Sequence, residues 1–412
     1  VNIWKSIYKK NGWNNYAAFN TNGGFNKPYI LFKAKNVTNI NKREEAILKV
    51  RPIAPGTKHP MKRLLHLAGR AWSFIASNLE GEHFVLNNSN EVKPFLKHAQ
   101  DKLAHLGKLK IKVWDIESCF PNMPKDAILF GSRELISKIE KKTGAYGIRI
   151  PRYSDTVPCQ WLIKANTRTT RGGTHEALGM EPSRKYVDIP FEVLLDIMAF
   201  ALDHAIIRMP NGQLLRQLSG IPMGDPLSPG MTIAACAWME HEWNQSIHDR
   251  DKQYFVAKRY MDDIIMIMAE NEEWDTKKFT EDFQQSTCYM RPLKLEEGKP
   301  DTFLETRFKI TDENQIKYWL KNDNENGEDK VWRYQHFHSH MPYIQKRSIL
   351  NACLRKAHKM ASDKETLRKS GVDKAKEFQR RGYPIGMLKA VCQYMAASQN
   401  DMTWMDIKND IY

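Results

Sequence analysis

Three short segments of the chain carry residues whose types and spacing could do chemistry. Asp115 follows a run of alternating apolar and basic residues, and Asp262 and Asp263 form a pair between two apolar runs. A Gly- and Pro-rich run at 220–229 lies between them. Hard divalent cations prefer carboxylate oxygens, and two such cations about 3.5–4 Å apart clamp the attacking and leaving oxygens of a phosphoryl transfer. The acids therefore predict a two-metal phosphoryl-transfer site.

Each segment alone has a simpler explanation. A lone Asp before aromatic residues is common, an acidic pair is more often a solvated turn, and a Gly- and Pro-rich run is more often only a loop. Their conjunction is informative, because an acid, a loop that lets backbone approach a substrate and a second acidic site occur together in a basic chain.

A rigid sheet would have to hold these acids. The alternation over 109–114 predicts a strand that ends at Asp115. The apolar runs 255–260 and 264–268 predict a β-hairpin with Asp262 and Asp263 at its tip. We also expect strands at 28–35, 46–53 and 303–310, and helices at 61–79, 190–208, 225–243 and within 344–395.

The composition narrows the class of partner. The 412 residues carry a net charge of +15, which favours nucleic acid or an anionic membrane surface. The sequence contains no uninterrupted run of about 18 apolar residues, the length that a membrane span requires. The six scattered cysteines form no CxxC pair, which argues against a disulfide scaffold and a zinc module and favours a reducing intracellular compartment. The start lacks a signal-peptide core and an initiator Met, so we expect a fragment or a processed product.

The three segments together resemble the pattern of reverse transcriptases, most closely those of Penelope-like retroelements and their telomerase-like relatives. The segment 115–124 resembles their first catalytic motif, 220–229 with 239–241 their second, and 258–264 their third. The runs 31–35 and 51–53 resemble fingers motifs, and the stretches 338–357 and 381–384 resemble the segment after the palm. The likeness runs from about residue 28 to about residue 390.

The resemblance implies an α+β right-hand polymerase, in which fingers, a palm with an antiparallel sheet and a helical thumb surround a template–primer duplex. We expect an N-terminal arm and fingers over 1–108, a palm over 109–310 and a thumb-like helical region over 311–412. The basic stretch at about 138–186 would be an insertion in the palm. We interpret it as a solvated segment, with nucleic-acid contact as the alternative.

The resemblance also implies roles for individual residues. Asp115, Asp262 and Asp263 would be the catalytic carboxylates that hold Mg²⁺, for which Mn²⁺ could substitute. Phe120 would collide with a ribose 2′-hydroxyl. The other residues expected to bind the nucleotide are Lys33, Arg51, Ile116 and Gly224. Either Lys294 or Lys299 would be the general acid for pyrophosphate. In the expected thumb, the basic residues of one amphipathic helix would contact the duplex backbone, or else form a solvated face; they are Lys346, Arg347, Arg355 and Lys356.

The sequence therefore predicts an RNA-directed DNA polymerase that uses an RNA template, a DNA or RNA primer and dNTPs, without a membrane. The alternatives are an RNA-templated RNA polymerase, against which Phe120 argues, and a catalytically silent nucleic-acid-binding subunit, against which the three acids argue. The natural template, the priming mechanism, mobility as an element and protein partners stay open.

Overall fold

The computed structural model describes residues 1–32, 50–79, 83–153, 157–163, 185–285, 288–322 and 333–411. The chain forms two compact units. The first unit comprises 1–87, 116–248 and 281–295, and the second comprises 88–115, 249–280 and 296–412. The predicted palm, 109–310, contributes to both units, so the boundaries of fingers, palm and thumb stay a prediction.

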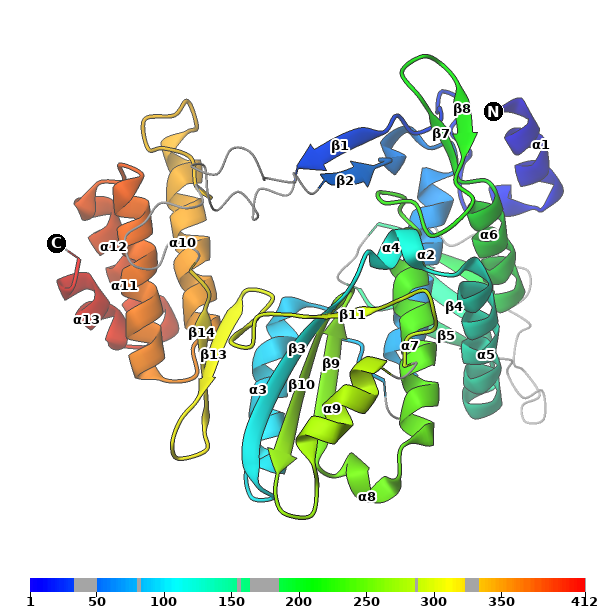
Figure 1. Cartoon of the computed structure of the whole chain (residues 1–412). Helices are drawn as coiled ribbons and strands as arrows, with labels where there is room; N and C mark the ends of the chain where they lie inside the picture. Colours follow the sequence, from blue (N-terminus) through cyan, green and yellow to red (C-terminus); the bar gives the residue numbers. More distant parts are fainter. Residues whose placement is uncertain are drawn as a thin grey trace, which may run out of the picture. The chain divides into compact units, whose positions relative to one another are not determined.

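A four-stranded sheet carries the predicted acids (Figure 1). Its strands lie in the order β11 (Leu295–Glu297), β3 (Lys108–Ile116), β10 (Asp263–Glu270) and β9 (Phe255–Tyr260). Strand β10 pairs antiparallel with β3 on one side and with β9 on the other. Its residues from Ile264 to Ala269 are all buried, as expected of a central strand covered on both faces. The predicted strand and hairpin are confirmed.

The rest of the second unit is a small sheet and a helical region. Strands β12 (Thr302–Phe303), β13 (Thr306–Ile310) and β14 (Ile316–Leu320) form an antiparallel sheet. Helix α3 (Val92–Leu103) contacts β9 and β10. In the sequence, α8 (Asp249–Lys252) precedes the hairpin, and α9 (Thr276–Gln285) follows it. The helical region predicted within 344–395 consists of α10 (Tyr343–Met360), α11 (Lys364–Arg380) and α12 (Ile385–Gln399), followed by α13 (Thr403–Asn409). These helices share one apolar core.

Helices α2 (Lys62–Ser77) and α7 (Ser228–Ser246) pack closely in the first unit (Figure 1). A Cβ on Gly230 would lie 2.6 Å from the backbone oxygen of Gly69, so the crossing requires glycine. Both helices were predicted, although α7 begins three residues later than expected. The unit also contains α5 (Lys125–Thr143) and α6 (Phe191–Asp203).

The predicted helix over 190–208 is shorter than expected. Helix α6 ends at Asp203, and β7 (Ile206–Arg208) pairs with β8 (Leu214–Arg216). The turn between these strands contains Pro210 and Gly212, whose φ is +87°, and both residue types favour a turn. Residues 206–208 therefore pair with 214–216 in a hairpin and do not continue the helix.

The basic stretch at 138–186 is not a wholly solvated insertion, so that interpretation was wrong for its described part. Its first residues complete α5. Strands β4 (Ala145–Pro151), β5 (Gln160–Ile163) and β6 (Tyr186–Pro190) then form a sheet with β4 in the centre. Ile148, Ile150 and Ile189 are buried there, because alternate residues of a strand face the core. Residues 164–184 lie outside the described residues.

The N-terminal part begins with α1 (Asn2–Lys10). Strands β1 (Tyr29–Phe32) and β2 (Val50–Ile53) pair antiparallel, as predicted. The connection between them, which includes Lys33, lies outside the described residues. No helix in the described part of the chain is long and apolar enough to cross a membrane.

Candidate active site

The sheet of the second unit brings the three predicted acids to one end. Asp115 on β3 lies directly opposite Asp263 on β10. Directly opposed residues of antiparallel strands have Cβ atoms about 4.5–5.5 Å apart and share a face. Asp262 lies in the two-residue turn that joins β9 to β10. All three side chains are half-buried, so they remain accessible to a ligand.

The hairpin turn has a backbone that few residues adopt. Met261 has a φ of +57°, a left-handed conformation that is uncommon outside glycine. Nη1 of Arg259, a buried side chain, donates a hydrogen bond of 2.8 Å to the Met261 carbonyl oxygen. This bond stabilises the turn that carries Asp262. Sequence reasoning missed Arg259, although it occupies an inward position in the alternation of β9.

A second residue that sequence reasoning missed is Lys321, which directly follows β14. Burial and the positive charges of Arg333 and Arg307 lower the pKa of Lys321. The negative charge of Asp301 and, to a smaller extent, that of Asp263 act in the opposite direction. Lys321 is therefore near enough to Asp263 for their charges to interact. About 60 residues separate the two in sequence, so no local pattern could have paired them.

The carboxylates of Asp115, Asp262 and Asp263 are the type of oxygen ligand that a hard cation prefers, although three are few. In the described ranges, no group of three or more His, Cys, Asp and Glu side chains is arranged so that it could hold a metal ion by itself. Mg²⁺ is commonly bound through one or two carboxylates, with water and substrate phosphates as its other ligands. Asp115, Asp262 and Asp263 present carboxylate oxygens at one end of the sheet, and metal binding by them stays a prediction.

Phe120 and the Gly- and Pro-rich run meet in the first unit. Phe120 lies on the short helix α4 (Cys119–Asn122), and its backbone oxygen accepts a hydrogen bond of 2.7 Å from the Ile221 amide. Gly220 has a φ of +69°, and a Cβ there would lie 2.5 Å from the Phe120 oxygen. The run therefore packs backbone to backbone against α4, which only glycine permits.

The same run pairs with the segment that follows β2. The Ala54 amide donates to the Met223 oxygen at 2.7 Å, and the Gly56 amide donates to the Gly224 oxygen at 2.9 Å. Arg51 is exposed on β2, three residues before Ala54. The loop 220–226 thus adjoins α4, which carries Phe120, on one side and the segment after β2 on the other. Ile116, in contrast, has a fully buried side chain, so only its backbone could contact a nucleotide.

Strand β11 distinguishes the two candidate lysines. The Glu117 amide donates to the Lys294 oxygen at 2.9 Å, and the Gly298 amide donates to the Val113 oxygen at 2.8 Å. These bonds set Lys294 opposite Glu117. Because side chains alternate along a strand, this register assigns Lys294 to the face of Asp115 and Lys299 to the opposite face.

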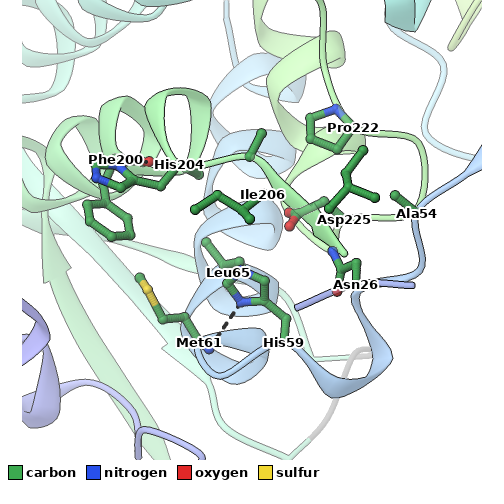
Figure 2. A pocket seen from close by; sticks show the side chains of 13 residues that line it. Asn26, Ala54, His59, Met61, Leu65, Phe200, His204, Ile206, Pro222 and Asp225 are labelled. Atoms are coloured by element: carbon green, nitrogen blue, oxygen red, sulfur yellow. Dashed lines mark hydrogen bonds between the residues drawn. The ribbon is translucent and has the colours of Figure 1, made fainter. Parts of the chain in front are cut away.

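A small cavity lies beneath the loop 220–226 (Figure 2). Its volume is about 20 Å³, enough for one water molecule. Asp225 lines it, and burial raises the pKa of this carboxyl to about 6, although a 2.9 Å hydrogen bond from the Leu227 amide to Oδ1 acts against the shift. Asn26 Oδ1 is buried there, and no described residue forms a hydrogen bond with it. Burial also lowers the pKa of His59 to about 4, so His59 brings no positive charge to Asp225 at neutral pH.

This pKa shift predicts a pH dependence of stability. A raised pKa means that the folded state binds more protons than the unfolded state between about pH 4 and about pH 6, so the contribution of Asp225 to stability is lost as pH rises through that window. Asp225→Asn cannot ionise and keeps an oxygen for Leu227. As pH rises from 4 to 6.5, we expect the free energy of unfolding of Asp225→Asn, relative to that of the wild type, to increase by roughly 1–3 kcal/mol. Urea unfolding at several pH values measures this difference.

The exposed Asp282, on α9, supplies the control for this measurement. Asp282→Asn should keep the pH dependence of the wild type. If Asp225→Asn also kept it, Asp225 would titrate normally and the cavity would impose no cost on its charge.

The structure corrects one of the predicted duplex contacts. Lys346 is buried in α10, where its Nζ donates to the Ser339 oxygen at 2.8 Å and lies 5.1 Å from the centre of the Phe337 ring. The expectation that Lys346 offers its charge to a duplex is therefore wrong for this structure. Arg355 donates to the Tyr394 hydroxyl at 2.8 Å, and Lys356 pairs with Glu305.

Arg347 is the predicted contact on α10 that is exposed. It borders a shallow pocket of about 280 Å³ with the exposed side chains of Tyr343, Ile344 and Tyr394. This face of the helical region offers a cation and aromatic rings to a partner.

Comparison with known proteins addresses the fold. No family model matches the chain, and no curated protein does. Among solved structures, the chain is similar to telomerase from Candida albicans in complex with a TWJ fragment of telomeric RNA, with a TM-score of 0.53 and 14% identity over 99% of this chain. The chain has a right-hand polymerase fold. It spans 65% of the length of that telomerase.

Two weaker likenesses accompany this match. Telomerase from Candida tropicalis, in complex with the same kind of RNA fragment, gives a TM-score of 0.49 at 13% identity over 98% of this chain and 58% of that one. A Sicinivirus RNA-dependent RNA polymerase gives 0.39 at 12% identity over 78% and 55%. In this fold the three acids stand at one end of β3, β10 and β9.

Proposed function

We propose that the chain is an RNA-directed DNA polymerase that extends a primer 3′-hydroxyl with dNTPs. The observation that carries this proposal is the position of Asp115 directly opposite Asp263, with Asp262 in the adjoining turn, in a right-hand polymerase fold. The reverse-transcriptase pattern of the motifs around these acids supports it further, and points to the Penelope-like and telomerase-like enzymes.

The carboxylates of Asp115 and Asp262 would hold Mg²⁺, with Asp263 beside them. When bound there, Mg²⁺ supplies charge stabilisation at the attacking and leaving oxygens. The protein's own residues would position these carboxylates. The bond from Arg259 to Met261 keeps the turn in one conformation, which holds the Asp262 carboxylate ready for the metal. A preorganised carboxylate needs little rearrangement in the transition state.

Lys294 would act as the general acid. Its ammonium would give a proton to the leaving pyrophosphate, and the strand register supports it over Lys299 because it lies on the face of Asp115. Arg51 would contact the triphosphate with its planar guanidinium, which suits phosphate geometry. Gly224 would let the loop backbone approach the nucleotide closely.

The nucleic-acid partners follow from charge and shape. The net charge of +15 favours a polyanion, and Arg347 with its neighbouring aromatic side chains would contact the template–primer duplex. The telomerase that this chain resembles was solved with a TWJ fragment of telomeric RNA, which supports RNA as a partner here. An intracellular compartment remains the expectation.

Primer extension tests the proposal directly. The purified chain, with a labelled primer on an RNA or a DNA template, should add dNTPs to the primer on RNA in the presence of Mg²⁺, and Mn²⁺ should substitute. Chelation by EDTA should stop the reaction. A preference for rNTPs would make the chain an RNA polymerase. Binding of the primed template without extension under any condition would make it a silent nucleic-acid-binding subunit.

A further inference from the structure

A groove of about 520 Å³ lies beside the first two turns of α2 in the first unit. Three exposed side chains of α2, Lys62, Arg63 and His66, line it, together with Phe19 and Arg152. None of the described residues that line this α2 groove is acidic. The first turn of α2 contains no acidic residue either. The α2 groove is therefore a recessed surface of positive charge.

Arg152 is oriented by two backbone carbonyls. Its Nε donates to the Tyr186 oxygen and its Nη1 donates to the Tyr16 oxygen, both at 3.1 Å. Carbonyl acceptors are neutral, so these bonds fix the guanidinium without cancelling its charge. A cation held in place loses less conformational entropy when it binds an anion than a freely moving side chain does.

An exposed aromatic ring stands beside these cations. Tyr153 directly follows Arg152 and is 78% exposed. The guanidinium carbon of Arg63 lies 5.2 Å from the centre of the Tyr153 ring, a cation–π distance. An exposed ring next to phosphate-binding cations is the arrangement on which unpaired bases stack.

The charge extends through the N-terminal part of the sequence. The first 79 residues contain fourteen Lys and Arg residues. The same stretch contains two acidic residues, Glu44 and Glu45. A stretch with that imbalance attracts a polyanion more strongly than a small anion, because a polyanion can neutralise several cations at once.

We propose that the α2 groove binds single-stranded nucleic acid, with Lys62, Arg63 and Arg152 on phosphates and Tyr153 stacked on a base. A duplex keeps its bases inside, so it could use the cations but not the ring. An acidic peptide would likewise leave Tyr153 unused. In the polymerase proposed above, the bound strand would be the unpaired part of the template, and this assignment alone rests on the proposed function.

Binding tests the groove without any reaction. The full chain is titrated with a fluorescent 12-nucleotide RNA, without divalent cations or nucleotides, at several salt concentrations. Lys62→Ala with Arg63→Ala should lower the salt slope of log affinity by roughly 0.7 for each phosphate that the variant no longer neutralises. Tyr153→Ala should weaken binding roughly 5- to 150-fold at an unchanged slope, and Tyr153→Phe should restore it.

Matched controls separate the groove from general charge. Lys277→Ala with Lys278→Ala removes two exposed cations from α9, and Phe130→Ala removes an exposed ring from α5; both should bind as the wild type does. The proposal is overturned if the groove variants bind the strand normally. It is also overturned if a blunt duplex or poly-glutamate loses affinity with Tyr153→Ala by the same factor, because the ring would then not be reading an unpaired base.

The template assignment has its own test. The Tyr153→Ala variant should lose extension on templates with a long 5′ overhang and keep it on an overhang of one nucleotide. Equal loss on both templates would end the assignment. A wild-type chain inactive on both would refute the proposed function, while the binding experiment would still decide whether the groove takes single strands.

Discussion

Asp262→Asn is expected to lower primer extension by roughly 10³-fold or more, while the protein folds normally and still binds a primed template. The amide keeps the shape of the side chain but removes the negative charge that a hard cation requires. Metal stabilisation of the transition state amounts to several kcal/mol, and each 1.4 kcal/mol is about tenfold in rate. The measurement is single-turnover extension, with a melting curve and a binding titration on the same sample.

Asp312→Asn is the matched control, because Asp312 is an exposed acid in the same unit, on the turn between β13 and β14. It should extend primers at the normal rate. An Asp262→Asn protein as active as this control would end the two-metal assignment, and a variant that melts early would move Asp262 from chemistry to stability of the hairpin.

Phe120→Ala is expected to raise the ratio of rNTP to dNTP incorporation about 5- to 150-fold. Extra atoms forced into a packed site cost roughly 1–3 kcal/mol, so removal of the ring should relieve the collision with a 2′-hydroxyl. Phe120 is half-buried on α4, which suits a ring that faces a ligand better than one in a core. Its backbone bond from Ile221 does not depend on the side chain, so the adjoining loop should keep its position.

Two control variants accompany this experiment. Phe120→Tyr keeps a ring and should keep the choice of sugar, and Phe130→Ala removes an exposed ring elsewhere and should change neither activity nor ratio. A Phe120→Ala protein that melts early, with its ratio unchanged, would make Phe120 a packing residue. The choice between DNA and RNA synthesis would then reopen.

The sequence predicted the parts of the site that local patterns determine. The alternation over 109–114 predicted β3, and the apolar runs 255–260 and 264–268 predicted the β9–β10 hairpin, so the strands that carry the three acids were recovered. The burial of Arg259 and the surroundings of Lys321 depend on which surfaces the fold brings together. Lys321 and Asp263, whose charges interact, belong to segments that no periodicity relates.

Lys346 illustrates a different kind of error. Charge alone suggested an exposed side chain, yet Lys346, Leu350 and Leu354 are spaced four residues apart and share the buried face of α10. Helical periodicity, applied to the lysine as well as to the leucines, would have indicated this burial. A long apolar stem lets lysine occupy such a position when its ammonium reaches a carbonyl.

The interleaving of the two units has a consequence for synthesis on the ribosome. The first unit needs residues 281–295 as well as 1–87, and the second begins at residue 88 and ends near the C-terminus. N-terminal segments normally fold as they emerge, but here α2 packs against α7, so about 140 residues beyond Asn87 must be made before α2 can reach its partner. Partly made chains would expose apolar surface throughout that interval, so their yield should depend on chaperones, and no contiguous fragment should reproduce either unit.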